Sequence, residues 1–274
     1  MPKREDTVVI TGASTGIGAA SAALLVERGY RVFGSVRRDE DEAALRERGA
    51  TPIRMDVTDL ESIQRAAAAV ADSLDGEGLV GLVNNAGVPG GGPLELLPLS
   101  ELRRVLEVNT IGVLAVTQAF LPLLRRAGGR IVNVSSVSGR VAMPFMGPYA
   151  ASKFALEALS DCLRRELAQA GIRVIVLEPG PVETPIWEKA ASLDTGHYAE
   201  SEYGPPLERL LRQATAEGGR LPVETIASAV LDALTRRRPP TRVLLVPGSR
   251  LMARLARLLP DRWLDGIVAR RLRT

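Results

Sequence analysis

Short apolar runs rich in valine and isoleucine alternate along the chain with longer stretches in which apolar residues recur at helical spacing. The short runs predict buried β-strands, and the longer stretches predict helices. The expected strands are Thr7–Ile10, Arg31–Val36, Thr51–Met55, Gly81–Asn84, Arg130–Ser135, Arg173–Glu178 and Arg242–Val246. The expected helices are Gly16–Arg28, Glu40–Arg48, Leu60–Ser73, Glu101–Arg125, Tyr149–Gln169 and Val223–Leu234.

Strands that alternate with helices imply βαβ crossovers, which build a parallel sheet covered by helices on both faces. We therefore predict the α/β class, with a doubly wound parallel sheet of about seven strands in one domain over residues 1–274. The alternation of strands and helices stops over residues 181–222, which are rich in Pro, Gly and polar residues. An irregular insertion of this length is more often functional than accidental. We interpret this region as a substrate lid and residues 248–274 as a basic, helical C-terminal extension.

The composition is that of an ordinary folded protein, with 274 residues of which 46% are hydrophobic. A net charge of +3 does not call for a nucleic-acid partner. Cys162 is the single cysteine, so an intrachain disulfide is excluded, and its place in a predicted helix favours a buried, inert thiol. The apolar run Val8–Ile10 is too short for a signal peptide, and Ile111–Leu124 is shorter than a membrane span. We expect a cytoplasmic protein, without a metal site.

A glycine-rich turn follows the first predicted strand, with the sequence Thr11-Gly12-Ala13-Ser14-Thr15-Gly16-Ile17-Gly18. Glycines let the backbone turn tightly and approach a pyrophosphate closely, and the next helix offers free N–H groups and the positive end of its dipole. Glycines also serve ordinary turns, but a position between a strand and a helix is the context that a nucleotide site requires. The turn therefore indicates a dinucleotide site.

This turn resembles the T-G-x-x-x-G-I-G motif of the classical short-chain dehydrogenase/reductase family. Three further segments resemble the motifs of that family in the same order: Asn84-Asn85-Ala86-Gly87, Tyr149-Ala150-Ala151-Ser152-Lys153, and Pro179-Gly180 followed by Thr184. The resemblance extends from Thr7 to Thr184. It implies a Rossmann-type fold and hydride transfer between a nicotinamide cofactor and a carbonyl or alcohol carbon.

Tyr149 and Lys153 carry the chemistry that this reaction needs. Hydride transfer to a carbonyl builds negative charge on its oxygen, and a phenol can donate a proton there. An unperturbed tyrosine has a pKa of about 10, and a nearby cation lowers it. Lys153 lies four residues after Tyr149, so both side chains share one helix face. Only three of the 35 basic residues are lysines, which hints that an ammonium is needed at this position.

The resemblance implies two further catalytic residues. Ser136 lies 13 positions before Tyr149, where the family has the serine that orients the substrate oxygen. Ser135 is the alternative, and strand alternation points the two side chains in opposite directions, so only one of them faces the site. Asn109 aligns with the residue that holds a water in the family's proton relay. It can also be read as a polar residue that interrupts a helix.

The resemblance also implies the cofactor-binding residues. They are Gly12, Ser14, Thr15, Gly16, Ile17, Gly18, Arg37, Arg38, Asp56, Val57, Asn85, Ala86, Gly87, Tyr149, Lys153, Pro179, Gly180, Val182 and Thr184. Val36 occupies the position where NAD-preferring members carry an acidic residue. Arg37 and Arg38 follow it, and two guanidiniums suit a 2′-phosphate, which favours NADP(H) over NAD(H). The two arginines are equally typical of a solvated turn, and Thr15 stands where some NADP-preferring members carry a basic residue.

The substrate is expected to be a lipophilic ketone or alcohol. Apolar residues follow the catalytic strands and can line a substrate pocket or belong to the core: Val141, Met143, Phe145, Ile186 and Trp187. This stretch looks most like family members that act on steroids, retinoids or similar compounds, with 3-oxoacyl thioester reductases as the alternative. A non-catalytic NADP-sensing protein is the alternative from another class. A sugar-nucleotide epimerase is disfavoured by the glycine spacing.

Two features concern partners. Residues 250–273 place apolar side chains among arginines, a pattern that can contact an anionic membrane surface, the lid or another subunit. Pro260 and Gly266 are expected to interrupt this helix. Family resemblance implies a homo-dimer or homo-tetramer. His197, the single histidine, lies in the lid as a substrate contact or as an exposed loop residue.

Overall fold

The computed structural model describes residues 6–186, 196–215, 219–248 and 260–273. Its centre is one parallel sheet with the strand order β3-β2-β1-β4-β5-β6-β7. The strands are β1 (Thr7–Ile10), β2 (Arg31–Val36), β3 (Thr51–Arg54), β4 (Gly81–Asn84), β5 (Arg130–Val134), β6 (Arg173–Pro179) and β7 (Arg242–Leu245). The order reverses between β1 and β4, and such a switch point opens a crevice at the carboxyl ends of the strands.

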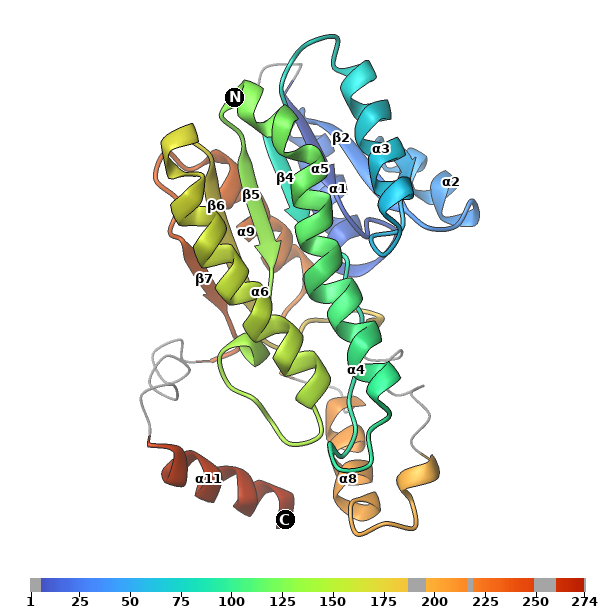
Figure 1. Cartoon of the computed structure of the whole chain (residues 1–274), viewed down its shortest axis with the longest axis vertical. Coiled ribbons are helices and arrows are strands. Elements are labelled where there is room, and N and C mark those ends of the chain that lie inside the picture. Colours follow the sequence, from blue (N-terminus) through green and yellow to red (C-terminus); the bar gives the residue numbers. More distant parts are fainter. Residues whose placement is uncertain (1–5, 187–195, 216–218, 249–259, 274) are drawn as a thin grey trace.

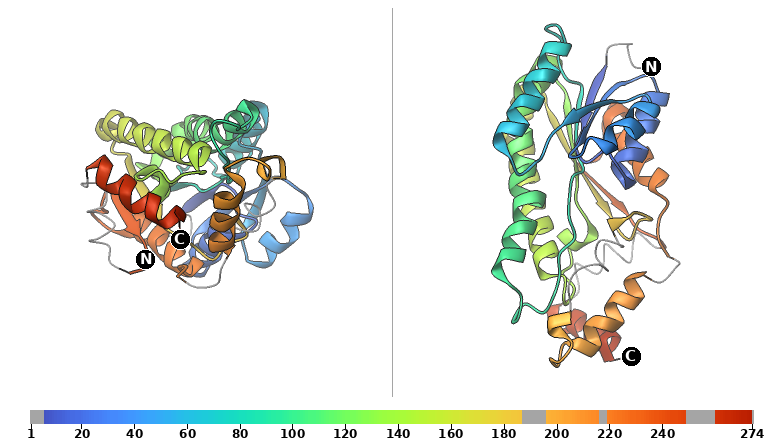
Figure 2. Two further views of the ribbon diagram at one scale, coloured as in Figure 1. Left: turned by 90° about the horizontal axis from the view of Figure 1, so that it is seen from below. Right: turned by 90° about the vertical axis from the view of Figure 1, so that its right-hand side faces the viewer.

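Helices cover both faces of the sheet (Figure 1). They are α1 (Gly16–Glu27), α2 (Glu40–Glu47), α3 (Leu60–Ser73), α4 (Leu99–Leu106), α5 (Gly112–Ala127), α6 (Gly147–Glu166), α8 (Gly204–Thr215), α9 (Val223–Thr235) and α11 (Asp261–Arg273). Short helical turns are η1 (Glu107–Ile111), η2 (Val137–Gly139), η3 (Ala168–Ala170) and η4 (Gly196–Tyr198). In two views at right angles, α8 and α11 lie beyond the carboxyl ends of the strands (Figure 2).

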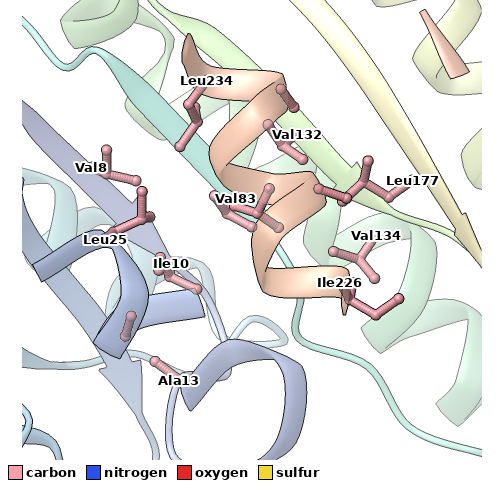
Figure 3. Packing of buried hydrophobic residues seen from close by; sticks show 14 of the residues in the cluster. Val8, Ile10, Ala13, Leu25, Val83, Val132, Val134, Leu177, Ile226 and Leu234 are labelled. Carbon is pink, nitrogen blue, oxygen red and sulfur yellow. The ribbon is translucent and has the colours of Figure 1, made fainter. Parts of the chain in front are cut away.

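Each face of the sheet has its own apolar core. On one face α1 and α9 pack on residues such as Val8, Ile10 and Val132 (Figure 3). On the other face α3 and α5 pack on residues such as Val9 and Leu82. Val8, Val9 and Ile10 are consecutive, and all three are fully buried. This explains why the central strands read as continuous apolar runs.

Local signals set the ends of several helices. Asp59 caps α3 by accepting hydrogen bonds from the N–H groups of Glu61 and Ser62, at 3.0 and 3.2 Å. Pro148 lies at the start of α6, where its missing N–H costs nothing. Gly128 ends α5 with a left-handed φ of 59°.

The predicted architecture is confirmed, while several details of the prediction are wrong. The expected helix Glu101–Arg125 begins at Leu99, ends at Ala127 and contains the π-helical turn η1. This continuous helix of 29 residues is long and apolar enough to cross a membrane by length and composition alone. Core helices pass the same test, and Val116, Phe120 and Leu124 of α5 are fully buried in the sheet-facing core. Cys162 is exposed rather than buried. Gly266 does not interrupt α11, which begins immediately after Pro260.

Candidate active site

The glycine-rich turn between β1 and α1 is closely folded on itself. Gly12 has a φ of +64°, a conformation that residues with a Cβ rarely adopt. A Cβ on Gly18 would lie 2.3 Å from the carbonyl oxygen of Gly12 and 2.6 Å from the side-chain amide of Asn85. The turn therefore tolerates no larger residue at position 18.

Thr11 and Asn85 clamp this turn to the end of β4. The Asn85 side-chain amide donates hydrogen bonds to the carbonyl oxygens of Thr11 and Gly12, both at 3.0 Å. In return, the Thr11 hydroxyl oxygen accepts from the backbone N–H groups of Asn85 and Ala86, both at 2.9 Å. The family resemblance implies that Asn85 binds the cofactor. The structure shows that its side chain also stabilises the turn.

The N-terminus of α1 is open to an anion. Thr15 is the N-cap residue, its side chain makes no capping hydrogen bond, and the first turn contains no acidic residue. Ser14, Gly16 and Ile17 are half-buried beside the exposed Thr15. The unsatisfied N–H groups and the positive end of the helix dipole suit a phosphate.

The segment after β6 closes over the same turn. A Cβ on Gly16 would lie 3.2 Å from the methyl group of Thr184, so these two residues are neighbours. The backbone N–H of Gly180 donates to the carbonyl of Leu245 at 2.7 Å, which ties the end of β6 to β7. Val182 is buried and forms an isolated bridge with Leu221. The structure thus brings Pro179–Thr184 and the glycine-rich turn together, as the family motif implies.

The two arginines after β2 differ in their partners. Arg38 forms paired contacts of 3.1 Å with both carboxylate oxygens of Asp41 and a 2.5 Å ion pair with Glu40. Arg37 is exposed and makes no ion pair or side-chain hydrogen bond within the described part of the chain. Val36 before them is buried. Of the two predicted guanidiniums, only that of Arg37 is available to a ligand.

The loop after β3 holds Asp56 and Val57, two of the expected cofactor-binding residues. Asp56 is half-buried, and its Oδ1 accepts from the backbone N–H and the hydroxyl of Thr58, at 2.9 and 2.8 Å. The carbonyl oxygen of Val57 would lie 2.5 Å from a Cβ on Gly112, at the start of α5. The Asp56 carboxylate therefore stabilises the loop in which Asp56 lies.

Tyr149, Lys153 and Ser136 converge where β5 ends and α6 begins. The Lys153 ammonium lies 5.7 Å from the centroid of the Tyr149 ring and donates to the carbonyl of Val134 at 2.9 Å. Ser136 follows β5, forms a side-chain hydrogen bond with Tyr149, and lies 3.4 Å from the carbonyl oxygen of Pro179. One helical turn separates Tyr149 from Lys153, so α6 fixes their spacing.

Burial shifts the pKa values of both Tyr149 and Lys153. It raises the pKa of Tyr149 above its usual value near 10, and the hydrogen bond with Ser136 opposes that shift. Burial lowers the pKa of Lys153 from 10.5 to about 8, and the charge of Glu157 opposes that shift. At neutral pH the phenol therefore carries its proton and the amine its charge, which is the state that a proton donor to a carbonyl oxygen requires.

The neighbouring serine points elsewhere. Ser135 is buried, and its hydroxyl would lie 3.0 Å from a Cβ on Gly139. The Ser135 hydroxyl makes no hydrogen bond within the described residues. Because Ser136 bonds Tyr149, the alternation expected for the two serines matches the geometry.

Asn109 lies in the π-helical turn η1, which the sequence did not predict. Its side chain is fully buried and bonds both backbone groups of Val88, at 2.9 and 3.0 Å, and the Ser152 hydroxyl at 3.1 Å. A Cβ on Gly87 would lie 3.3 Å from Asn109 Oδ1 and 3.9 Å from the Lys153 ammonium. Asn109 thus links the loop after β4 to the catalytic helix, and π turns recur at functional sites.

Two aromatic residues, Phe145 and Tyr203, pack against each other near the start of α6. Phe145 has a φ of +64°, and a left-handed bulky residue marks a constrained position. Its ring meets that of Tyr203 edge to face at 6.3 Å, and the Tyr203 hydroxyl donates to Glu95 at 2.5 Å. Sequence reasoning missed Tyr203 and Glu95, which come from distant segments. Trp187 and the side chain of His197 lie outside the described residues.

Comparisons with known proteins agree with this arrangement. The family model described as short chain dehydrogenase matches residues 6–194. The NADPH-dependent 3-dehydrocapnine reductase of Ornithobacterium rhinotracheale is 36% identical over 268 residues, which are 94% of each chain. Human retinol dehydrogenase 5 is 36% identical over 288 residues, covering 98% of this chain and 89% of the relative. A short chain dehydrogenase structure from Burkholderia phymatum in complex with NAD aligns with a TM-score of 0.79 at 28% identity, over 95% of each chain.

Proposed function

The chain belongs to the short-chain dehydrogenase family and is an oxidoreductase that acts on a carbonyl or alcohol group, and from this premise we propose that it uses NADP(H) and a lipophilic ketone or secondary alcohol. The observation that carries the proposal is the convergence of Tyr149, Ser136 and Lys153 at the carboxyl ends of the strands. Ligands of doubly wound sheets bind at this edge.

The residues present fit a nicotinamide dinucleotide. The turn at Gly12 and Gly18 leaves no room for side chains, and the N-terminus of α1 has no side-chain cap. These features would hold the pyrophosphate, and Arg37 would hold a 2′-phosphate. Tyr149 and Lys153 would hold the nicotinamide ribose.

The bound cofactor supplies or accepts the hydride, and the chain's own residues manage the substrate oxygen. Tyr149, protonated at neutral pH, donates its proton to the carbonyl oxygen during reduction and takes it back during oxidation. Ser136 orients that oxygen by a hydrogen bond. The Lys153 ammonium favours the phenolate that remains after proton transfer, because an opposite charge stabilises an anion in a buried site.

The unpaired state of Arg37 supports NADP(H), and the relative that is NADPH-dependent supports it independently. We expect Arg37→Gln to raise the KM for NADPH by roughly 10- to 100-fold, since a charge-assisted hydrogen bond contributes about 1.5–3 kcal/mol. The KM for NADH should change little. Initial rates with both cofactors measure this.

Arg38→Gln is the matched control, because its guanidinium is already bound by Asp41 and Glu40. It should leave both KM values close to those of the native enzyme. A larger loss of NADPH affinity in Arg38→Gln than in Arg37→Gln would contradict the assignment. A native preference for NADH would overturn the NADP(H) proposal itself.

The lipophilic substrate is supported by the half-buried apolar residues Val137, Val141 and Phe145 between Ser136 and Tyr149 in the chain, and by the half-buried Ile186, two positions after Thr184. The relative that acts on retinol supports it as well. Purified protein with NADPH or NADH should be tested on steroid and retinoid ketones, aldehydes and 3-oxoacyl thioesters, by loss of the reduced cofactor's absorbance. Turnover confined to 3-oxoacyl thioesters would favour the thioester reductase. Tight NADPH binding without turnover of any compound would favour the sensor protein.

The C-terminal extension supports a membrane contact as part of the proposal. Trp263 and Ile267 of α11 are 69% and 49% exposed, beside the exposed Arg262. An exposed apolar face among arginines suits an anionic lipid surface. We expect the protein to co-sediment with vesicles containing phosphatidylserine and Trp263→Ser to bind several-fold less. If the native protein and Trp263→Ser sedimented equally with the vesicles, or if neither sedimented, the proposed membrane contact would be wrong. Leu251, Leu255, Leu258 and Leu259 lie outside the described residues.

Exposed apolar side chains on the long helices support a homo-dimer or homo-tetramer. Ile111 is 53% exposed and Phe154 is 44% exposed, on η1 and α6 respectively. These two elements are neighbours, joined by the hydrogen bond from the Thr110 hydroxyl to the Ser152 carbonyl oxygen, and a contiguous exposed apolar patch marks a surface that another subunit can cover. The cytoplasmic location stays a prediction.

A further inference from the structure

A line of charged residues extends along α6 behind the catalytic pair. Tyr149, Lys153, Glu157 and Asp161 follow one another at intervals of four residues, so they share one face of the helix. Glu157 is 9% exposed, and nothing in the proposed chemistry uses it. A buried carboxylate is costly unless it is paired, so its presence requires an explanation.

Arg242 of β7 holds the Glu157 carboxylate from the far side. Its guanidinium Nε lies 2.9 Å from Glu157 Oε2, and its Nη2 lies 2.9 Å from Asp161. The other carboxylate oxygen of Glu157 is buried without a hydrogen-bond partner in the described part of the chain. The carboxylate is therefore anchored on one side only.

The surroundings of Gly139 place the Glu157 side chain beside the main chain of Lys153, one helical turn earlier on α6. A Cβ on Gly139 would lie 3.1 Å from Glu157 Cγ, 3.1 Å from the Lys153 carbonyl oxygen and 3.0 Å from the Ser135 hydroxyl. Lys153 itself is 5% exposed and forms no ion pair with any carboxylate among the described residues. The Lys153 ammonium donates to the Val134 carbonyl oxygen at 2.9 Å instead. Glu157, one helical turn away on the same face of α6, is the carboxylate whose charge favours the protonated amine.

We propose that Glu157 is a positioning residue of the reaction: its buried carboxylate, anchored by Arg242, keeps the Lys153 side chain charged in the active site. This inference rests on the proposed function, because it assigns a task to Lys153 as the charged partner of Tyr149. Glu157 does not touch the reacting atoms. It acts through the field that it exerts on the lysine.

The other charges around Glu157 do not replace it. Glu178 of β6 is fully buried and pairs with Arg140 at 2.6 Å and with Arg242 at 3.5 Å. Burial raises the pKa of Glu178, and these two guanidiniums oppose the shift. Asp161 is shared with Arg164 at 3.0 Å and Arg165 at 3.8 Å, nearer the surface. Glu178 and Asp161 each pair with an arginine besides Arg242, and Glu157 is the carboxylate one helical turn from Lys153.

The low lysine content gives a direct test. Only Lys3, Lys153 and Lys189 are present, so a pH titration of isotope-labelled lysine side chains by NMR resolves Lys153, which Lys153→Met assigns. The native midpoint is expected at about 8. In Glu157→Gln it should fall by about one pH unit, because the opposite charge is lost and the shape is kept. Glu157→Asp, which keeps the charge, should restore most of the shift.

Asp161→Asn is the matched control, since it removes the same charge one helical turn further on and should leave the Lys153 midpoint unchanged. If Glu157→Gln is too unstable to titrate, Glu157→Leu is a second neutral variant, because Arg242 retains Asp161 as a partner. An unmoved Lys153 midpoint in a folded neutral variant would overturn the proposal. A lowered midpoint in a protein that turns over no substrate would support the inference and remove the proposed function instead.

Discussion

Tyr149→Phe is expected to lower kcat for carbonyl reduction by about 10²- to 10⁴-fold, the usual contribution of a positioned proton donor. The phenylalanine ring fills the same space but has no proton to give and no hydrogen bond for Ser136. NADPH affinity should fall far less than kcat, because the glycine-rich turn, Arg37 and Lys153 still hold the cofactor. Steady-state rates and fluorescence titration of NADPH, measured on the same preparation, separate the two effects.

Tyr203→Phe is the control for this prediction. It removes a phenol that packs on Phe145 near the start of α6, but this phenol donates to Glu95. A small change in kcat is expected. If the two tyrosine variants lost activity equally, the hydroxyl of Tyr149 would have no special part in proton transfer.

Lys153→Met is expected to abolish most turnover and, at the same time, to make the protein more stable. Burial lowers the pKa of Lys153 from 10.5 to about 8, so the folded state binds this proton less tightly than the unfolded state. At neutral pH the charged amine therefore destabilises the fold by about 3 kcal/mol, at about 1.4 kcal/mol for each pH unit. Methionine carries no charge, and the melting temperature should rise on the order of 5–10 °C.

The pH dependence of stability tests the same prediction. Between pH 8 and 10.5 the unfolded lysine holds its proton and the folded one has lost it, so this group makes stability increase with pH in that window. The melting temperature of the native protein and that of Lys153→Met should both be measured over this pH range. The difference between the two should isolate the increase that Lys153 causes. A variant that melts below the native protein at pH 7 would contradict the idea that the site holds its charge at the expense of stability.

The fold was predictable because its signals are local. Each central strand is buried on both faces and reads as an apolar run, and the turn after Ile10 carries its glycines in the sequence itself. The ends of the predicted strands and helices agree with the structure within two residues, apart from the end of α6, which was expected at Gln169 and lies at Glu166. The π turn at Asn109 was not predictable, because one additional residue in a helical turn leaves the apolar pattern nearly unchanged.

The site was predictable as a set of motifs, but the partners of its residues were not. Nothing near Arg38 in the sequence distinguishes it from Arg37, and only the fold shows that Asp41 occupies one of them. Glu157 and Arg242 are 85 positions apart, so their contact exists only after β7 joins the sheet beside β6. Cys162 was expected inside because cysteine is usually buried, yet its place on α6 faces water.

The clamp between Thr11 and Asn85 also bears on how the enzyme recognises its nucleotide. All four of its hydrogen bonds join chain atoms to chain atoms, so the turn has its closed shape before any ligand arrives. A preorganised cradle spares the conformational entropy that a flexible loop would lose on binding. The free energy of pyrophosphate recognition is then available for affinity, and the rigid cradle delivers the nicotinamide end to Tyr149 in one fixed orientation.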